Sequence, residues 1–185
     1  MRLLLDTAVV GEICHPRKHA GTKQWLDRVS ATHELMLSEV VDYELRRELL
    51  RIGARRSLRA LDDLGLTITY VPVTTATWRA AAALWARARL AGRPSASADA
   101  IDVDILIAQQ AIENAAVVVT PNKRHFEAFV AVMSFDEVPP SRMGGGFDRS
   151  GFAQEVLRST VLLFEFACAQ VVLHPPEHHL EYHLA

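Results

Sequence analysis

Short apolar runs alternate with longer helical segments through the first 130 residues, and this alternation is the strongest constraint on the fold. The apolar runs are too short for helices and are rich in leucine or β-branched residues, so each predicts a buried strand. They lie at 2–5, 34–38, 66–73 and 116–120. Helical patterns occupy 22–29, 39–51, 55–64, 76–90, 104–115 and 123–129. We therefore expect an α/β fold, with a three-layer parallel sheet flanked by helices and joined by right-handed crossovers.

Composition excludes several classes of protein. The 185 residues, 50% of them hydrophobic, suffice for one core, and a net charge of −2 argues against a chain that is basic throughout. Cys14 and Cys168 have no metal-like spacing, so neither a disulfide framework nor a structural zinc site is indicated. We see no signal peptide and no comfortable membrane span, and we expect a cytoplasmic protein with no membrane partner.

The C-terminal part of the chain differs in composition from the rest. Residues 134–151 are rich in proline and glycine and predict a linker. We expect a folded domain at 1–138 and a linker with a C-terminal extension at 139–185. The apolar run at 161–173 is interrupted by Glu165 and fits a packing helix, an oligomer contact or an edge strand. Its role is left open.

Acidic residues stand where the predicted strands and helices meet. Asp6 follows the first strand, Glu44 lies on the helix after the second strand, and Asp104 opens the helix before the fourth. Parallel strands end at one edge of a sheet, so these carboxylates can converge there. The alternative is that each one caps a helix or pairs with a neighbour, as Asp6 can through N-capping and Glu44 through Arg47 at i+3.

Three carboxylates held close together repel one another, and a cation offsets that repulsion. Mg²⁺ and Mn²⁺ are hard ions that take oxygen ligands and retain several waters. Such a site can polarise a phosphodiester, activate a water and stabilise the leaving oxygen. Convergence of these side chains would therefore indicate metal-dependent phosphodiester chemistry.

Four stretches of the sequence together resemble the successive motifs of a PIN domain. They are RLLLDTAVV, SEVVDYELRRELLR, DVDILIAQQAI and VVVTPNKRHFEAF. They occur in the family's order over residues 2–130, and they are similar in particular to VapC-type toxins of bacterial toxin–antitoxin pairs. The resemblance implies a Mg²⁺- or Mn²⁺-dependent ribonuclease, with an RNA substrate, a cognate antitoxin protein and a homodimeric state.

The resemblance also implies roles for individual residues. Asp6, Glu44 and Asp104 match the metal-binding acidic positions. The fourth motif departs from the pattern, because Asn122 and His125 stand where a carboxylate is expected. Asn122 becomes a candidate catalytic residue that ligates a metal or orients a water, and His125 an accessory one. The remaining accessory candidates are Asp99 and Asp102, which can compensate for the missing charge, and Thr7, which can bind a metal-bound water or help to cap a helix.

A nuclease also needs a surface for phosphates. Three arginines come after Glu44 and are spaced four residues apart, at Arg47, Arg51 and Arg55. They would form one stripe if the helix ran unbroken through Gly53. Such a stripe is the candidate RNA-binding surface. The alternative is a solvated helix face whose arginines pair with nearby acidic residues.

Two other functions remain open. The first is a catalytically weak or inactive PIN-like module that binds RNA or protein, which the missing fourth carboxylate favours. The second is a phosphatase or phosphotransferase with Asp6 as nucleophile. That chemistry ordinarily needs a second Asp two residues on, where Ala8 stands, so the sequence argues against it.

Overall fold

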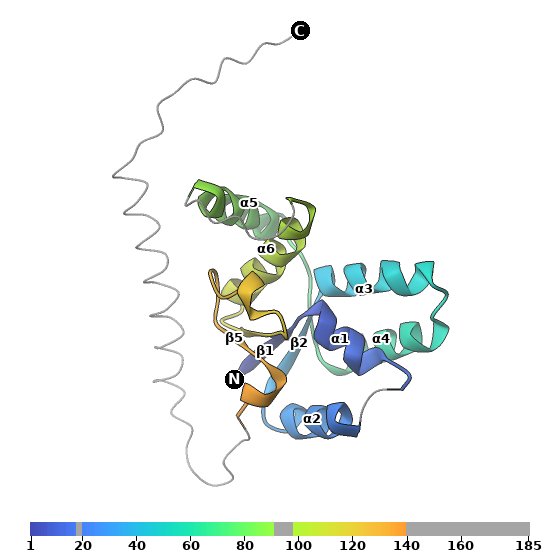
Figure 1. Ribbon diagram of the computed structural model, residues 1–185. Coiled ribbons are helices and arrows are strands. Elements are labelled where there is room, and N and C mark those ends of the chain that lie inside the picture. Colours follow the sequence, from blue (N-terminus) through green and yellow to red (C-terminus); the bar gives the residue numbers. More distant parts are fainter. Residues whose placement is uncertain (18–19, 91–97, 140–185) are drawn as a thin grey trace, which may run out of the picture.

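The computed structural model describes residues 1–17, 20–90 and 98–139, with no side chains described for residues 20 and 98–102 (Figure 1). The apolar run at 161–173 and nearly all of the expected extension lie outside these ranges. Val138 is 2% exposed and belongs to the hydrophobic core, so the packed core reaches the proposed domain boundary. None of the described helices is long and apolar enough to cross a membrane.

A five-stranded parallel sheet forms the centre of the molecule, in the order β3-β2-β1-β4-β5. The strands are β1 (Arg2–Leu5), β2 (Glu34–Ser38), β3 (Thr69–Val71), β4 (Val117–Val119) and β5 (Val132–Met133). Leu3, Leu4 and Leu5 of the central strand are fully buried. Burial on both faces explains why the central strands are continuous apolar runs without polar alternation.

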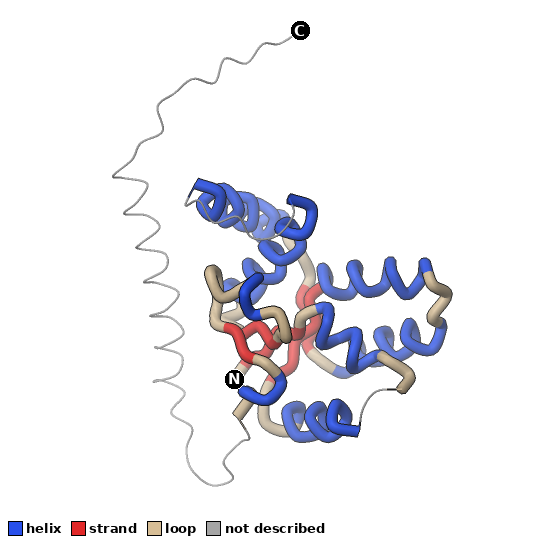
Figure 2. The backbone as a smooth tube through the Cα atoms, in the orientation of Figure 1, coloured by secondary structure: helices blue, strands red, loops and turns tan. Residues whose placement is uncertain are grey.

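Helices cover the sheet on both sides (Figures 1 and 2). They are α1 (Thr7–Cys14), α2 (Ala20–Ser30), α3 (Glu39–Arg51), α4 (Arg55–Thr67), α5 (Thr75–Leu90) and α6 (Ala98–Glu113). The first four gather on one side, and α5 packs with α6 on the other. Two short 3₁₀ helices, η1 (Lys123–His125) and η2 (Phe135–Glu137), follow β4 and β5. The predicted three-layer α/β fold is confirmed.

Several element predictions need correction, and no helix was predicted at the position of α1. The strand expected at 66–73 is only β3, because α4 runs on to Thr67, whose hydroxyl donates to the carbonyl of Asp63 at 2.6 Å. The helix expected at 123–129 is only the 3₁₀ turn η1, with the N–H of Phe126 bonded to the carbonyl of Lys123. Strand β5 was not predicted, because two residues are too few for a periodic signal.

The helix after β2 does not run through Gly53. Gly53 has φ +68, a left-handed conformation that favours glycine, and α3 ends just before it. The N–H of Ala54 bonds the carbonyl of Leu49 at 2.9 Å, and the N–H of Gly53 bonds that of Leu50 at 3.1 Å. This pair of bonds is a Schellman motif, which closes the helix. The chain then turns back, and α4 packs beside α3 as a helical hairpin.

Candidate active site

Asp6 lies at the carboxyl end of β1 and is 7% exposed. Its Oδ1 accepts a hydrogen bond of 2.7 Å from the backbone N–H of Thr7, as the N-cap of α1. Its Oδ2 accepts one of 2.7 Å from the hydroxyl of Thr120, just after β4. Burial raises the pKa of the Asp6 carboxyl, against the lowering effect of the two hydrogen bonds, and the charge of Glu44 also raises it. Asp6 therefore caps a helix and also takes part in a charged cluster.

Glu44 reaches the same cluster from α3. That helix begins at the end of β2, where the Ser38 hydroxyl accepts hydrogen bonds from the N–H groups of Val40 and Val41 at 3.0 and 3.4 Å. Further along, Oε2 of Glu44 accepts a hydrogen bond of 2.5 Å from the hydroxyl of Thr7. Within the described ranges Glu44 forms no ion pair with Arg47. Glu44 is thus held by the residue that follows Asp6.

Asp104 lies inside α6 and does not open it, because the helix begins at Ala98. Its side chain is 16% exposed, and its Oδ2 is 3.1 Å from Nδ1 of His125. Burial is the largest influence and raises the pKa of Asp104 to about 6, with the charges of Asp6 and Glu44 adding to the rise and His125 opposing it. Asp104 therefore shares the electrostatic environment of the other two carboxylates.

A buried polar network positions the two helices that bear Glu44 and Asp104. Gln110 of α6 is fully buried, and its Nε2 donates to the carbonyls of Val71 and Pro72 at 3.0 and 3.2 Å. Its Oε1 accepts a hydrogen bond from the hydroxyl of Ser38, the residue that caps α3. The network ties α6 to the start of α3 and to the end of β3.

The structure therefore brings together five of the predicted residues. They are Asp6, Thr7, Glu44, Asp104 and His125. Sequence reasoning missed Thr120 and Gln110. The position of Thr120 at the end of a parallel strand, equivalent to that of Asp6, could have indicated it. No signal distinguishes Gln110 from an exposed helical glutamine.

Other predicted residues do not join this cluster. Asn122 is exposed, and its side chain makes no hydrogen bond with any described residue. The side chains of Asp99 and Asp102 lie outside the described set, although both positions belong to α6. Of the two residues that stand in place of the expected carboxylate, His125 therefore lies at the cluster through Asp104, whereas Asn122 does not join it.

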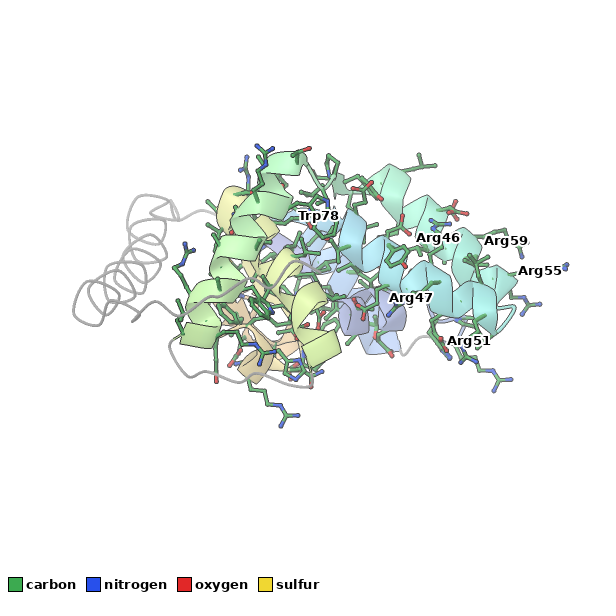
Figure 3. The ribbon with its side chains drawn as sticks, turned by 90° about the horizontal axis from the view of Figure 1, so that it is seen from above. Arg46, Arg47, Arg51, Arg55, Arg59 and Trp78 are labelled. Carbon is green, nitrogen blue, oxygen red and sulfur yellow. The ribbon has the colours of Figure 1, made fainter. Side chains whose placement is uncertain are left out.

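The predicted arginines do not form one stripe, because Gly53 separates α3 from α4. Figure 3 shows Arg47 along α3 and both Arg51 and Arg55 near the tip of the hairpin. Arg51 pairs with Glu48 at 2.5 Å, as the alternative of a solvated helix face expected. The guanidinium carbon of Arg47 instead lies 5.6 Å from the centre of the Tyr43 ring.

The clustered carboxylates Asp6, Glu44 and Asp104 offer oxygen ligands of the kind that a hydrated divalent ion takes. Among the described side chains, no three of His, Cys, Asp or Glu are arranged to hold an ion directly as they stand. Mg²⁺, however, commonly binds through one or two carboxylates and keeps several waters. Burial is the main cause of the raised pKa values of Asp6 and Asp104, and the charge of Glu44 adds to both, so a nearby cation would favour the charged carboxylates. Asp6 and Glu44, with Asp104 reached through water, are the residues able to hold such an ion.

Comparison with known proteins adds a family and a set of similar folds. The family model of the PIN domain matches residues 3–130. VapBC2 from Rickettsia felis, bound to a DNA fragment from their promoter, has 17% identity and a TM-score of 0.59 over 72% of this chain and 98% of that chain. FitAcB from Neisseria gonorrhoeae has 23% identity and a TM-score of 0.58, over 74% of this chain and 99% of that chain.

A third solved structure has the same fold. VapBC-1 from nontypeable Haemophilus influenzae has 21% identity and a TM-score of 0.56, over 74% of this chain and 100% of that chain. At these identities the likeness shows the fold alone. The comparison with curated protein sequences gives no match.

Proposed function

The chain belongs to the PIN domain family, and on that premise we propose that it is a metal-dependent endoribonuclease. We further propose that it is the toxin of a toxin–antitoxin pair. The observation that carries the first proposal is the grouping of carboxylates at one edge of the sheet, where Thr7 hydrogen-bonds both Asp6 and Glu44 and the charges of these two act on Asp104. A cluster of this kind is expected where a divalent ion offsets the repulsion.

Each residue of the cluster has a role in this proposal. Asp6 and Glu44 hold the ion, which when bound activates a water and stabilises charge on the phosphate oxygens. Thr120 fixes one oxygen of Asp6, and Thr7 fixes one oxygen of Glu44. Asp104, in contact with His125, orients the attacking water. The contacts made by Thr120, Thr7 and His125 hold the three carboxylates in place before the RNA binds.

Asn122 and the arginines have proposed roles on the exposed side of the site. The amide of Asn122 has no partner among the described side chains and is available to a water or a phosphate. Arg47 is the arginine that we propose to bind RNA beside the carboxylates. Arg51 and Arg55, near the tip of the helical hairpin, would contact phosphates of the RNA backbone.

An antitoxin protein is the proposed partner. Support comes from the VapBC assemblies among the solved structures of similar fold. A homodimeric state remains a prediction from the family resemblance, and a cytoplasmic location remains a prediction from the sequence. A second candidate function is a weakly active RNA- or protein-binding module, because Asn122 and His125 replace an expected carboxylate and the described side chains form no three-ligand group.

Cleavage of a labelled single-stranded RNA tests the proposal and separates the two candidates. We expect cleavage by the full chain with Mg²⁺ or Mn²⁺, none with EDTA, and a loss of orders of magnitude in the Asp6→Asn variant. Asp27→Asn, an exposed carboxylate on α2, is the matched control and should cut as wild type does. Binding without metal-dependent cleavage would instead support the weakly active module.

A further inference from the structure

An exposed aromatic ring lies on the helix that carries Glu44. Tyr43 precedes Glu44 on α3 and is 62% exposed, although large aromatic side chains usually bury most of their surface. Tyr70, the other described tyrosine near α3, is less exposed at 39%, and its hydroxyl is engaged with Asp42 at 3.2 Å. Tyr43 has no such hydrogen bond among the described residues, so its ring is available to a ligand.

A cation lies against this ring. The guanidinium carbon of Arg47 is 5.6 Å from the centroid of the Tyr43 ring, one helical turn further along α3. Arg46 and Arg51, its neighbours on the helix, are occupied by acidic partners. Within the described ranges Arg47 forms no ion pair, so its charge is free to meet a phosphate.

Tyr43 and Arg47 together match one nucleotide of a single strand. A base is a flat surface that stacks on an aromatic ring, and an arginine can bind the adjoining phosphate. In a duplex the faces of the bases are stacked on one another and are closed to a side chain. Tyr43 and Glu44 are consecutive residues of α3, so a nucleotide held by this pair would lie close to the bond to be cleaved.

We propose that Tyr43 stacks one unpaired base of the RNA substrate and that Arg47 binds the phosphate beside that base. The proposal rests on the proposed ribonuclease function and adds a requirement to it. The substrate must present an unpaired base at a fixed position relative to the cleaved bond.

Binding of a fluorescein-labelled single strand of about ten mixed nucleotides tests the proposal by fluorescence anisotropy. The full chain carries Asp6→Asn so that the RNA stays intact. We expect Tyr43→Leu to weaken binding about tenfold, whereas Tyr43→Phe, which keeps the ring, should stay within about twofold. Trp78→Leu is the matched control, since Trp78 is 56% exposed on α5, and it should leave binding unchanged.

A second probe locates the stacked base. Single abasic nucleotides are placed in turn along the same RNA. At one position, the abasic strand should bind the protein with Tyr43 about tenfold more weakly than the intact strand does. The Tyr43→Leu variant should bind that abasic strand and the intact strand equally well. A complementary strand that pairs the RNA should abolish tight binding. Equal loss at every position would contradict the stacking of one base.

The outcomes separate this proposal from the proposed function. If the wild-type chain neither binds nor cleaves RNA, the proposed function fails. If it cleaves RNA and Tyr43→Leu binds and cleaves as wild type does, only the stacking proposal is overturned. If Tyr43→Leu leaves RNA binding intact but weakens association with a protein partner, the ring belongs to a protein interface and the proposal is again overturned.

Discussion

The hydroxyl of Thr7 donates a 2.5 Å hydrogen bond to Oε2 of Glu44, which is 37 residues away along the chain. The backbone N–H of the same threonine donates to Oδ1 of Asp6 at 2.7 Å. One residue thus connects the carboxylate that follows β1 to the carboxylate carried by α3. Thr7 donates both bonds to carboxylate oxygens, so it fixes the separation of the two carboxylates.

The first prediction concerns this bridge. Thr7→Val keeps the shape and the backbone N–H but removes the hydroxyl, so the cap on α1 survives and Glu44 is released. We expect metal affinity and RNA cleavage to fall by about 10–100-fold, as for other groups that orient metal ligands. Thr7→Ser restores the hydroxyl and should recover most of the loss. A Thr7→Val variant with wild-type cleavage would show that the bridge has no part in the site.

The second prediction concerns the charge of Asp104 in the metal-free protein. Its folded pKa is about 6, above the usual value of 3.8. Between these values the folded state holds more protons than the unfolded state, so this group lowers stability as pH rises through the window. Asp104→Asn removes the charge and keeps an oxygen for His125. The unfolding free energy of the variant minus that of wild type should therefore increase by about 1–2 kcal/mol between pH 4 and pH 7.5.

Urea unfolding in EDTA at the two pH values measures this difference. Asp27→Asn is the control, and its difference from wild type should not change with pH. Added Mg²⁺ should stabilise the wild type more than Asp104→Asn, because the ion offsets the repulsion that the variant has already lost. A difference that shrinks as pH rises would contradict the assigned direction of the shift.

The third prediction concerns the network around Gln110. Gln110→Leu removes the partner of the Ser38 hydroxyl and of the carbonyls of Val71 and Pro72. Buried polar groups left without partners should lower the unfolding free energy by about 2–3 kcal/mol. The measurement is urea unfolding, with Gln24→Leu, at an exposed position of α2, as the control. Equal stability of the two variants would mean that the network does not hold α6 in place.

The fourth prediction compares two glycines. Gly53 has φ +68 and nothing within 4 Å of an added Cβ, so Gly53→Ala should cost about 1 kcal/mol through backbone conformation alone. Gly21, inside α2, also has nothing within 4 Å, and Gly21→Ala should stabilise the protein by about 0.5–1 kcal/mol. Thermal unfolding of both variants should shift in opposite directions. A shift in the same direction would contradict the conformational argument.

Part of the site follows from sequence because parallel strands share one carboxyl edge. That rule places Asp6, after β1, and Glu44, on the helix after β2, near each other. The start of α6 could have been placed earlier, because Ile101 continues the helical spacing of Ile105 and Ala108 backwards past Asp104. The arginine stripe failed because Gly53 closes α3 in a left-handed conformation, and a glycine in a helical pattern does not by itself reveal that the helix ends there.

Binding of Mn²⁺, followed by electron paramagnetic resonance of the free ion, tests the central claim most directly. The full chain should remove Mn²⁺ from solution at about one ion per chain, and Asp27→Asn should do the same. Asp6→Asn should bind at least about tenfold more weakly, because it removes a charged oxygen ligand. Equal Mn²⁺ binding by wild type and Asp6→Asn, or RNA cleavage by a wild-type chain that binds no Mn²⁺ and persists in EDTA, would contradict the account.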